Sequence, residues 1–326
     1  MANYWKNRRV LITGCTGLMG SWLAKSLVSK GANVVGLVRD EVPQSDLILS
    51  GTASRITIVD GDVADHPNML RVMNEYEIQT IFHLAAQTIV GTASRSPLST
   101  FETNIKGTWC TLEAARNSSL NPDVIVASSD KAYGDQIKLP YTEDMPLIGS
   151  YPYDVSKSAA DLIARSYFKS YGMKVAVTRC ANLFGGGDIN FSRLIPGAML
   201  WILKKHPIVI RSDGKFKRDY LYVEDAAECY TTLAEKIGEK AVKGEAFNFG
   251  NGQPITVIDL VNKILKVTKA KVPIKIENSA VNEIRDQYLS TEKARKVLGW
   301  KPNHTLDSAL TKTYKWYERY YKAGLF

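Results

Sequence analysis

The strongest constraint on the fold is an alternation of short apolar runs with longer amphipathic segments through the first half of the chain. Runs rich in valine and isoleucine occupy residues 9–13, 33–38, 55–59, 80–85 and 123–128, and a sixth at 174–179 follows a long helical stretch. Alternating strands and helices are typical of a parallel sheet that helices cover on both faces. Almost continuously apolar runs fit strands that are buried on both sides. The sequence therefore predicts an α/β fold with a Rossmann-type doubly wound parallel sheet.

A glycine-rich loop joins the first run to the helical segment after it. Glycines spaced three apart allow a tight turn, let backbone amides approach a pyrophosphate, and direct a helix N-terminus at its negative charge. In this strand-loop-helix context the spacing predicts a dinucleotide site rather than a purely structural turn. The loop residues expected to contact the dinucleotide are Gly14, Thr16, Gly17, Leu18, Met19 and Gly20.

Charged residues after the second and third runs bear on which dinucleotide binds. Asp40 could hold the ribose hydroxyls of NAD, whereas Arg39 could pair with the extra phosphate of NADP. Because Arg39 comes first, we expect NAD or NADP, with NADP slightly favoured; the alternative is an exposed pair at the start of a loop. Asp62 and Val63 are expected at the adenine edge, although an aspartate in a turn often caps the backbone.

Tyr153 and Lys157 are four residues apart in a segment that reads as helical, so both project from one face. We expect the cation to lower the pKa of the phenol and make Tyr153 a general base toward a sugar hydroxyl. Lys157 could also hold the nicotinamide ribose. With Ser129 upstream and the glycine loop before it, the pair predicts a catalytic site.

Composition excludes several other classes of protein. The net charge of +9 comes from scattered lysines without interleaved aromatic residues, which indicates a solvated surface and no nucleic-acid partner. The four cysteines and four histidines are isolated, so neither disulfides nor a metal site is expected. No apolar run is long enough for a signal peptide or a membrane span, and we expect a cytoplasmic protein that does not bind membranes.

Seven phrases make the chain similar to the extended short-chain dehydrogenase/reductase superfamily, in the branch that acts on nucleotide-activated sugars. They are "TGCTGLMG", "HLAAQ", "TNIKGT", "SSDKAYG", "YDVSK", "RDYLYVED" and "KVLGW". The resemblance implies a nucleoside-diphosphate sugar as substrate and a homodimer built partly from residues 98–117 and 154–171. It also implies cofactor contacts from Leu84, Ala85, Ala86 and Asn104. Residues 1–182 would bind the dinucleotide and carry the catalytic groups, and residues 183–326 would mainly bind the sugar nucleotide, with some segments returning to the first domain.

Asp130 and Lys131, directly after Ser129, favour one reaction of that branch. By resemblance, 4,6-dehydratases place an acid and a base there, whereas 4-epimerases carry small neutral residues. Asp130 would be the acid and Lys131 the base, and a lysine accepts a proton only where burial or nearby positive charge favours the neutral amine. The alternative for Lys131 is a solvated or salt-bridging side chain.

The nucleotide and some rival functions stay open. The Asp-Lys pair, the N-terminal phrase and "GGGD" with "RLIP" resemble CDP-glucose 4,6-dehydratases, whereas "RDYLYVED" leaves GDP-mannose, dTDP-glucose and UDP-glucose open. A 4-epimerase would need only Tyr153 and Lys157, and a more distant alternative is a non-catalytic NAD(P)-sensing or RNA-binding relative. Substrate contacts implied by the resemblance are Gln87, Asn182, Asn190, Arg193, Arg218 and Arg285; for each of the last five the alternative is a surface residue.

Overall fold

The computed structural model describes residues 3–279 and 284–326. Within them, seven parallel strands form the central sheet in the order β11-β6-β5-β4-β1-β2-β3. This confirms the predicted doubly wound sheet. The strands are β1 (Arg9–Thr13), β2 (Asn33–Val38), β3 (Thr57–Asp60), β4 (Thr80–His83), β5 (Asp123–Ala127), β6 (Val175–Cys180) and β11 (Ala246–Phe249).

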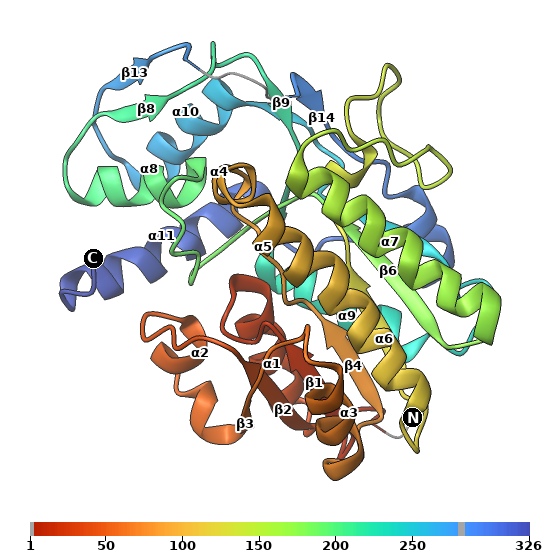
Figure 1. The fold of residues 1–326 in the computed structure, drawn as a ribbon. Helices are drawn as coiled ribbons and strands as arrows, with labels where there is room; N and C mark the ends of the chain where they lie inside the picture. The colour runs from red at the N-terminus through yellow and green to blue at the C-terminus, as the bar shows by residue number, and fades with distance from the viewer. Residues whose placement is uncertain (1–2, 280–283) are drawn as a thin grey trace.

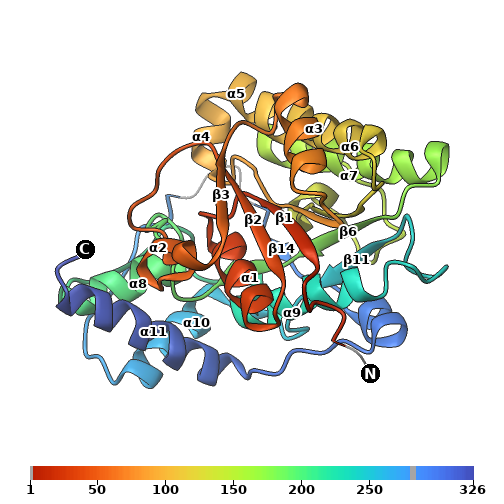
Figure 2. The ribbon, with the colours of Figure 1, turned by 90° about the horizontal axis from the view of Figure 1, so that it is seen from below.

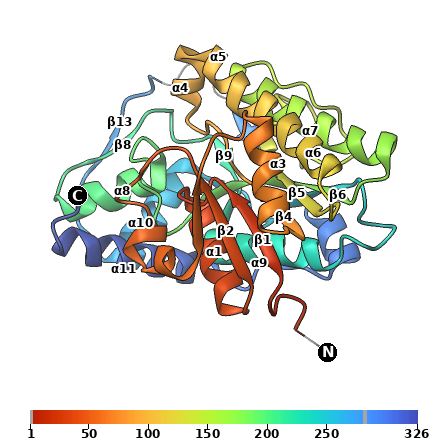
Figure 3. The ribbon, with the colours of Figure 1, turned by 60° about the horizontal axis from the view of Figure 1, so that its bottom comes forward.

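Helices cover both faces of this sheet (Figure 2 and Figure 3). One face carries α3 (His66–Glu75), α6 (Gly107–Asn117) and α7 (Pro152–Tyr171), and the other carries α1 (Leu18–Ser29) and α9 (Val223–Glu235). Neighbouring residues of a strand point to opposite faces. In β1, Val10 and Ile12 therefore join the core that contains Phe82, while Leu11 joins the core that contains Leu112. Two buried layers explain why the strands read as continuously apolar.

Short elements connect the sheet to the loops at its edges. They are α2 (Asp46–Leu49), α4 (Val90–Arg95), α5 (Pro97–Phe101), a 3-10 turn at Thr52–Arg55, a π-helical turn at Glu102–Lys106, and a 3-10 turn at Asp130–Tyr133. The π-helical turn joins α5 to α6 without a break, so residues 97–117 run as one helical segment. No helix in the described ranges has the length and hydropathy that crossing a membrane requires.

The C-terminal part forms a smaller mixed region and also contributes to the central sheet. Its elements are β7 (Asn182–Phe184), α8 (Leu194–Leu203), β8 (Ile208–Ile210), β9 (Lys217–Arg218), β10 (Tyr220–Tyr222), β12 (Ile255–Thr256), α10 (Val257–Thr268), β13 (Ile274–Ile276), β14 (Asp286–Gln287), a π-helical turn at Ala294–Leu298 and α11 (Leu306–Lys322). Figure 1 shows α8, β8, α10 and β13 grouped apart from β1, β2 and β3. The chain nevertheless returns to the sheet through α9 and β11, so one edge strand comes from beyond residue 182. The boundary at residue 182 stays a prediction.

Candidate functional site

The glycine loop closes against the end of β4. Gly14 has φ +70, and a Cβ added there would lie 2.8 Å from the amide nitrogen of Ala85. Thr13 Oγ1 accepts the N–H groups of Leu84 and Ala85 at 3.1 Å each, which holds the two loops together. A Cβ on Gly20 would overlap the carbonyl of Gly14. Both glycines are therefore required by the close approach of backbone to backbone.

The same loop leaves backbone donors for an anion. Helix α1 begins after Gly17, which makes no side-chain cap. The first N–H groups of a helix have no intrahelical partner and carry partial positive charge. Leu18, Met19 and Gly20 form this first turn, so their position fits the diphosphate of a dinucleotide.

A cavity of about 220 Å³ opens beside the loop. It is lined by seven of the residues predicted to bind the cofactor, namely Gly14, Thr16, Arg39, Asp62, Val63, Ala85 and Ala86. Gln87, expected on the substrate side, lines this cavity as well. Whether these residues bind a dinucleotide stays a prediction, but the structure brings them to one place.

Arg39 already has acidic neighbours in this cavity. Its Nε donates to Asp40 Oδ2 at 2.8 Å, and its Nη1 lies 3.9 Å from Asp62 Oδ2. Arg39 and Asp40 are exposed, and Asp62 is partly buried. Two carboxylates therefore compete for the charge of Arg39 in this cavity.

Asn104 lies behind the loop after β4 and supports this loop through hydrogen bonds. It is buried, its Oδ1 accepts the N–H of Gln87 at 2.7 Å, and its Nδ2 donates to Gln87 O and Ser156 Oγ. These bonds tie the loop after β4 to α7. The described contacts of Asn104 therefore support the loop rather than reach into the cavity.

Tyr153 and Lys157 lie on α7 and are both buried. Burial raises the pKa of Tyr153 to about 12, while a hydrogen bond with Ser129 acts in the opposite direction. Burial also lowers the pKa of Lys157 to about 8, and its Nζ donates to Ala127 O at 2.8 Å. The expectation that Lys157 lowers the pKa of Tyr153 is wrong for this structure, because desolvation of the phenol dominates.

Asp130 and Lys131 stand on the 3-10 turn that follows β5. Ser129 Oγ accepts the N–H of Lys131 at 3.2 Å and donates to Asp130 Oδ1 at 3.1 Å. Burial raises the pKa of the Asp130 carboxyl, and Lys131 lowers it in part. Lys131 is half-buried, and its Nζ donates to the amide oxygen of Gln287 at 2.8 Å. The turn therefore presents a buried carboxyl group of raised pKa next to an amine.

Asp154 adds a second buried carboxyl beside this turn. Its Oδ1 is buried and has no hydrogen-bond partner in the described residues. Burial raises the pKa of Asp154 to about 6, with Lys131 lowering it and Asp130 raising it. No sequence motif singled this residue out, because its burial depends on the packing of residue 149 against α7.

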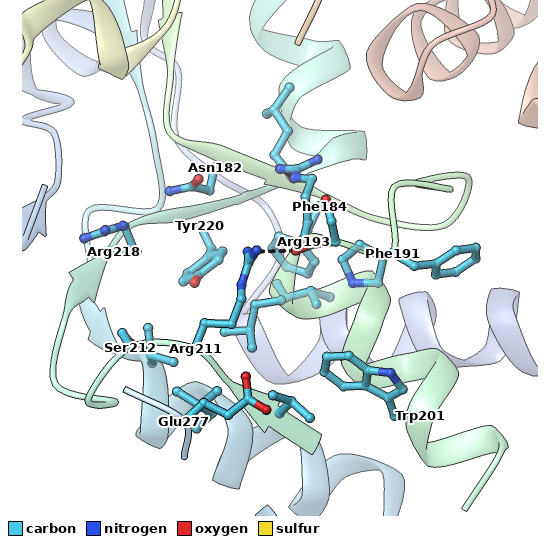
Figure 4. A pocket seen from close by; sticks show the side chains of 18 of the residues that line it. Asn182, Phe184, Phe191, Arg193, Trp201, Arg211, Ser212, Arg218, Tyr220 and Glu277 are labelled. Atoms are coloured by element: carbon cyan, nitrogen blue, oxygen red, sulfur yellow. Dashed lines mark hydrogen bonds between the residues drawn. The ribbon is translucent and has the colours of Figure 1, made fainter. Parts of the chain in front are cut away.

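A larger cavity of about 470 Å³ reaches Lys131 from the C-terminal region (Figure 4). Four residues predicted at the active site or to bind substrate line it: Lys131, Asn182, Arg193 and Arg218. Asn190 and Arg285 are not among the lining residues. Asn190 Oδ1 instead accepts the N–H and Oγ–H of Ser192, and the carbonyl of exposed Arg285 accepts from Arg218 Nη1.

Sequence reasoning missed several lining residues, of which Arg211 is the most informative. Figure 4 shows Arg211 reaching into the cavity, with Asn182, Arg218 and Tyr220 on one side and Trp201 on another. Its Nη2 donates to Ser192 O at 3.0 Å. Its only sequence signal is its place directly after the apolar run at 208–210. Other lining residues that were missed are Phe191, Trp201, Ser212, Tyr220 and Glu277. Within residues 3–279 and 284–326, no three His, Cys, Asp or Glu side chains cluster as metal ligands would.

Comparison with known proteins finds relatives along the whole chain. The family model described as GDP-mannose 4,6 dehydratase matches residues 11–313. The chain is 30% identical to dTDP-glucose 4,6-dehydratase 1 of Escherichia coli K12, covering 95% of this chain and 92% of that protein. It is 29% identical to CDP-glucose 4,6-dehydratase of Salmonella typhimurium LT2, covering 97% and 92%.

A solved structure supports the same likeness. The crystal structure of a dTDP-glucose 4,6-dehydratase from Streptomyces venezuelae, with NAD bound, has a TM-score of 0.84 and 26% identity, covering 95% of this chain and 97% of that one. Solved structures with this fold also include a UDP-glucose 4-epimerase. The fold alone therefore does not separate the two reactions.

The buried carboxyl of Asp154 predicts an unusual dependence of stability on pH. Its pKa is about 6 in the folded protein and about 3.9 in an unfolded chain. The folded state then binds the extra proton between these values, so stability falls as pH rises from about 4 to about 6. We expect Asp154→Asn to be more stable than wild type at pH 7 by about 1–2 kcal/mol, allowing for screening. Urea unfolding from pH 4 to 7 measures this, with exposed Asp135→Asn as control. Equal stability of Asp154→Asn and wild type at both ends of the range contradicts the prediction.

Proposed function

Because the chain belongs to the GDP-mannose 4,6-dehydratase family, within the short-chain dehydrogenase/reductase superfamily, we propose that it is an NAD(P)-dependent 4,6-dehydratase of a nucleotide hexose. The product is the 4-keto-6-deoxy sugar. The observation that carries the proposal is the turn after β5, on which buried Asp130 stands beside Lys131, a lining residue of the larger cavity. A 4-epimerase has no use for this acid and amine.

The residues around the smaller cavity fit a nicotinamide dinucleotide. The close backbone approach at Gly14 and the uncapped start of α1 suit its diphosphate, and Asp62 and Val63, which line the same cavity, would hold its adenosine end. When bound, this group supplies a reversible hydride acceptor for carbon 4 of the sugar, the hydride returning to carbon 6. The protein's own residues then have only protons to move.

Each proton has a residue at the proposed site. Tyr153 takes the proton of the C4 hydroxyl, and the neighbouring Ser129 hydroxyl acts to lower the pKa of Tyr153. Ketone formation makes the hydrogen on carbon 5 acidic, and the neutral amine of Lys131 removes it. Asp130 gives its proton to the departing C6 hydroxyl, which leaves as water, and Lys131 returns its proton to carbon 5 when carbon 6 regains the hydride. The buried Asp130 carboxyl suits this step because its pKa is raised.

The larger cavity supplies cations for a diphosphate. Arg193, Arg211 and Arg218 line it together, and a guanidinium matches phosphate oxygens with two parallel donors. The sequence favours a CDP-glucose or GDP-mannose type of substrate. Relatives named for dTDP-glucose and CDP-glucose support a glucose nucleotide first.

Incubation with CDP-, GDP-, UDP- and dTDP-hexoses, followed by mass analysis, tests the reaction. We expect one hexose to lose water. Lys131→Met and Asp130→Asn should each slow water loss by roughly a hundredfold or more, the usual scale for a positioned proton carrier. Exposed Lys138→Met is the matched control. Full dehydration by Lys131→Met would place the base elsewhere, and epimerised hexose without water loss would establish the epimerase instead.

Arg39 tests the choice of cofactor. We propose that it pairs with the extra phosphate of NADP, so Arg39→Gln should weaken NADP binding at least tenfold while changing NAD binding little. Calorimetric titration of the cofactor-stripped protein measures both, with the distant Arg55→Gln as control. An equal loss of affinity for NAD and NADP contradicts the proposal and leaves Arg39 with a structural role in its ion pairs with Asp40 and Asp62.

We also propose a homodimer through α5, α6 and α7. Large apolar side chains are exposed there, including Leu98 at 74%, Leu162 at 55% and Trp109 at 43%. Two helices that expose apolar side chains in this way suit a partner surface of the same kind.

Sedimentation at micromolar concentration tests the dimer. We expect the wild type to be dimeric and Leu162→Lys to be largely monomeric, because a charge cannot be buried there without a partner. Ile137→Lys, at a fully exposed position outside these helices, should stay dimeric. A monomeric wild type refutes the proposal.

A further inference from the structure

Gln287 holds the amine that the proposed reaction uses as its base. Lys131 Nζ donates to Gln287 Oε1 at 2.8 Å, across 156 positions of sequence. Gln287 is fully buried, whereas Lys131 is half-buried and lines the larger cavity. The amide therefore contacts Lys131 from the buried interior, and Lys131 remains accessible from the larger cavity.

The backbone around Gln287 is held by hydrogen bonds to neighbouring segments on two sides. In β14 it pairs with Arg218 of β9, and Asp286 Oδ1 accepts the N–H of Lys217 at 3.0 Å. On the other side, Tyr141 donates its N–H to Tyr288 O at 2.9 Å and accepts the N–H of Ser290 at 2.8 Å. Such a strand cannot shift easily, so the amide oxygen has a defined place.

The amide nitrogen of Gln287 indicates why a glutamine stands at this position. Gln287 Nε2 is buried and has no hydrogen-bond partner in the described residues. A buried donor without a partner is costly, and an apolar side chain of the same length would avoid that cost. A glutamine at this position is therefore explained by its contact with Lys131 and not by packing.

We propose that Gln287 is a positioning residue for Lys131. Its oxygen fixes one N–H of the amine, so the lone pair of the neutral amine is directed at carbon 5 of the sugar. An amide does this without charge, whereas a carboxylate in the same place would hold the lysine protonated. The inference rests on the proposed dehydratase function and adds a residue that no motif of the chain identified.

Several other charged and titratable groups surround Lys131, and an uncharged side chain at position 287 adds no further charge to them. Asp130 stands beside it on the same turn and Asp154 faces it from α7, and burial raises the pKa of both carboxyls. Tyr153 on α7 is a buried phenol, and Arg218 on β9 acts on Asp130. Arg193, Arg211 and Glu277 line the cavity that Lys131 also lines. A new carboxylate 2.8 Å from the amine would outweigh these neighbours.

Two substitutions at Gln287 separate positioning from packing. Gln287→Glu should move the acidic limb of the kcat/KM profile for dehydration upward by one pH unit or more, since an opposite charge this close favours the protonated amine. Gln287→Met keeps the length but removes the acceptor, and should lower kcat tenfold or more with KM within about twofold. Gln79→Glu, which keeps an acceptor for Arg9 N at the amino end of β4, is the control and should change neither.

The outcomes distinguish this inference from the function on which it rests. An acidic limb that stays in place in a folded Gln287→Glu, while the wild type dehydrates its hexose, overturns the role of Gln287 and leaves the dehydratase. If Gln287→Glu does not fold, full kcat in Gln287→Met overturns the role equally. A wild type that dehydrates no hexose removes the proposed function, and the role of Gln287 falls with it.

Discussion

The active centre depends on one buried guanidinium. Arg179, on β6, forms two bonds of 2.8 and 2.9 Å with Asp161 of α7, while its Nη1 donates to Tyr133 OH at 2.8 Å. Tyr133 belongs to the turn that carries Asp130 and Lys131, and its hydroxyl bonds to Asn248 of β11 at 2.7 Å. A fully buried charge is tolerated only when its partners satisfy it, and removal of one partner typically costs 3–5 kcal/mol. The helix that carries Tyr153 and the turn that carries Asp130 are therefore held in register by the same charge.

Burial around that centre has a chemical effect of its own. It raises the pKa of Tyr153, Asp130 and Asp154 and lowers the pKa of Lys157. In each case the neutral form is favoured, because a poorly solvated site penalises charge. A site of this kind favours the protonated form of its acids and the neutral form of Lys157, which suits a reaction that moves protons between carbon and oxygen. The cost is a less stable fold near neutral pH, a common property of functional sites.

Local patterns were enough to predict the sheet and the glycine loop, whereas Asp130 and Lys131 were identified by family resemblance. The strands and the loop are encoded by residues adjacent in sequence, so strand periodicity and the backbone needs of Gly14 are visible without a structure. What could not be predicted depends on distant pairing. Arg211 enters the cavity only because β8 packs beside β13, and Gln287 meets Lys131 only because β14 pairs with β9. Gln87 was expected at the substrate but lines the smaller cavity, and the pKa of Tyr153 reflects burial that spacing does not report.

The place of β11 at the edge of the sheet has a consequence for biosynthesis. Residues 246–249 complete the sheet against β6, yet they leave the ribosome roughly seventy residues after β6 itself. Until they emerge, the nascent chain presents β6 with an open edge of backbone donors and acceptors, and Tyr133 lacks its partner Asn248. Open strand edges invite pairing with other chains. Residues 1–182 thus cannot complete the central sheet by themselves during translation, because the C-terminal part of the chain supplies the strand that closes it.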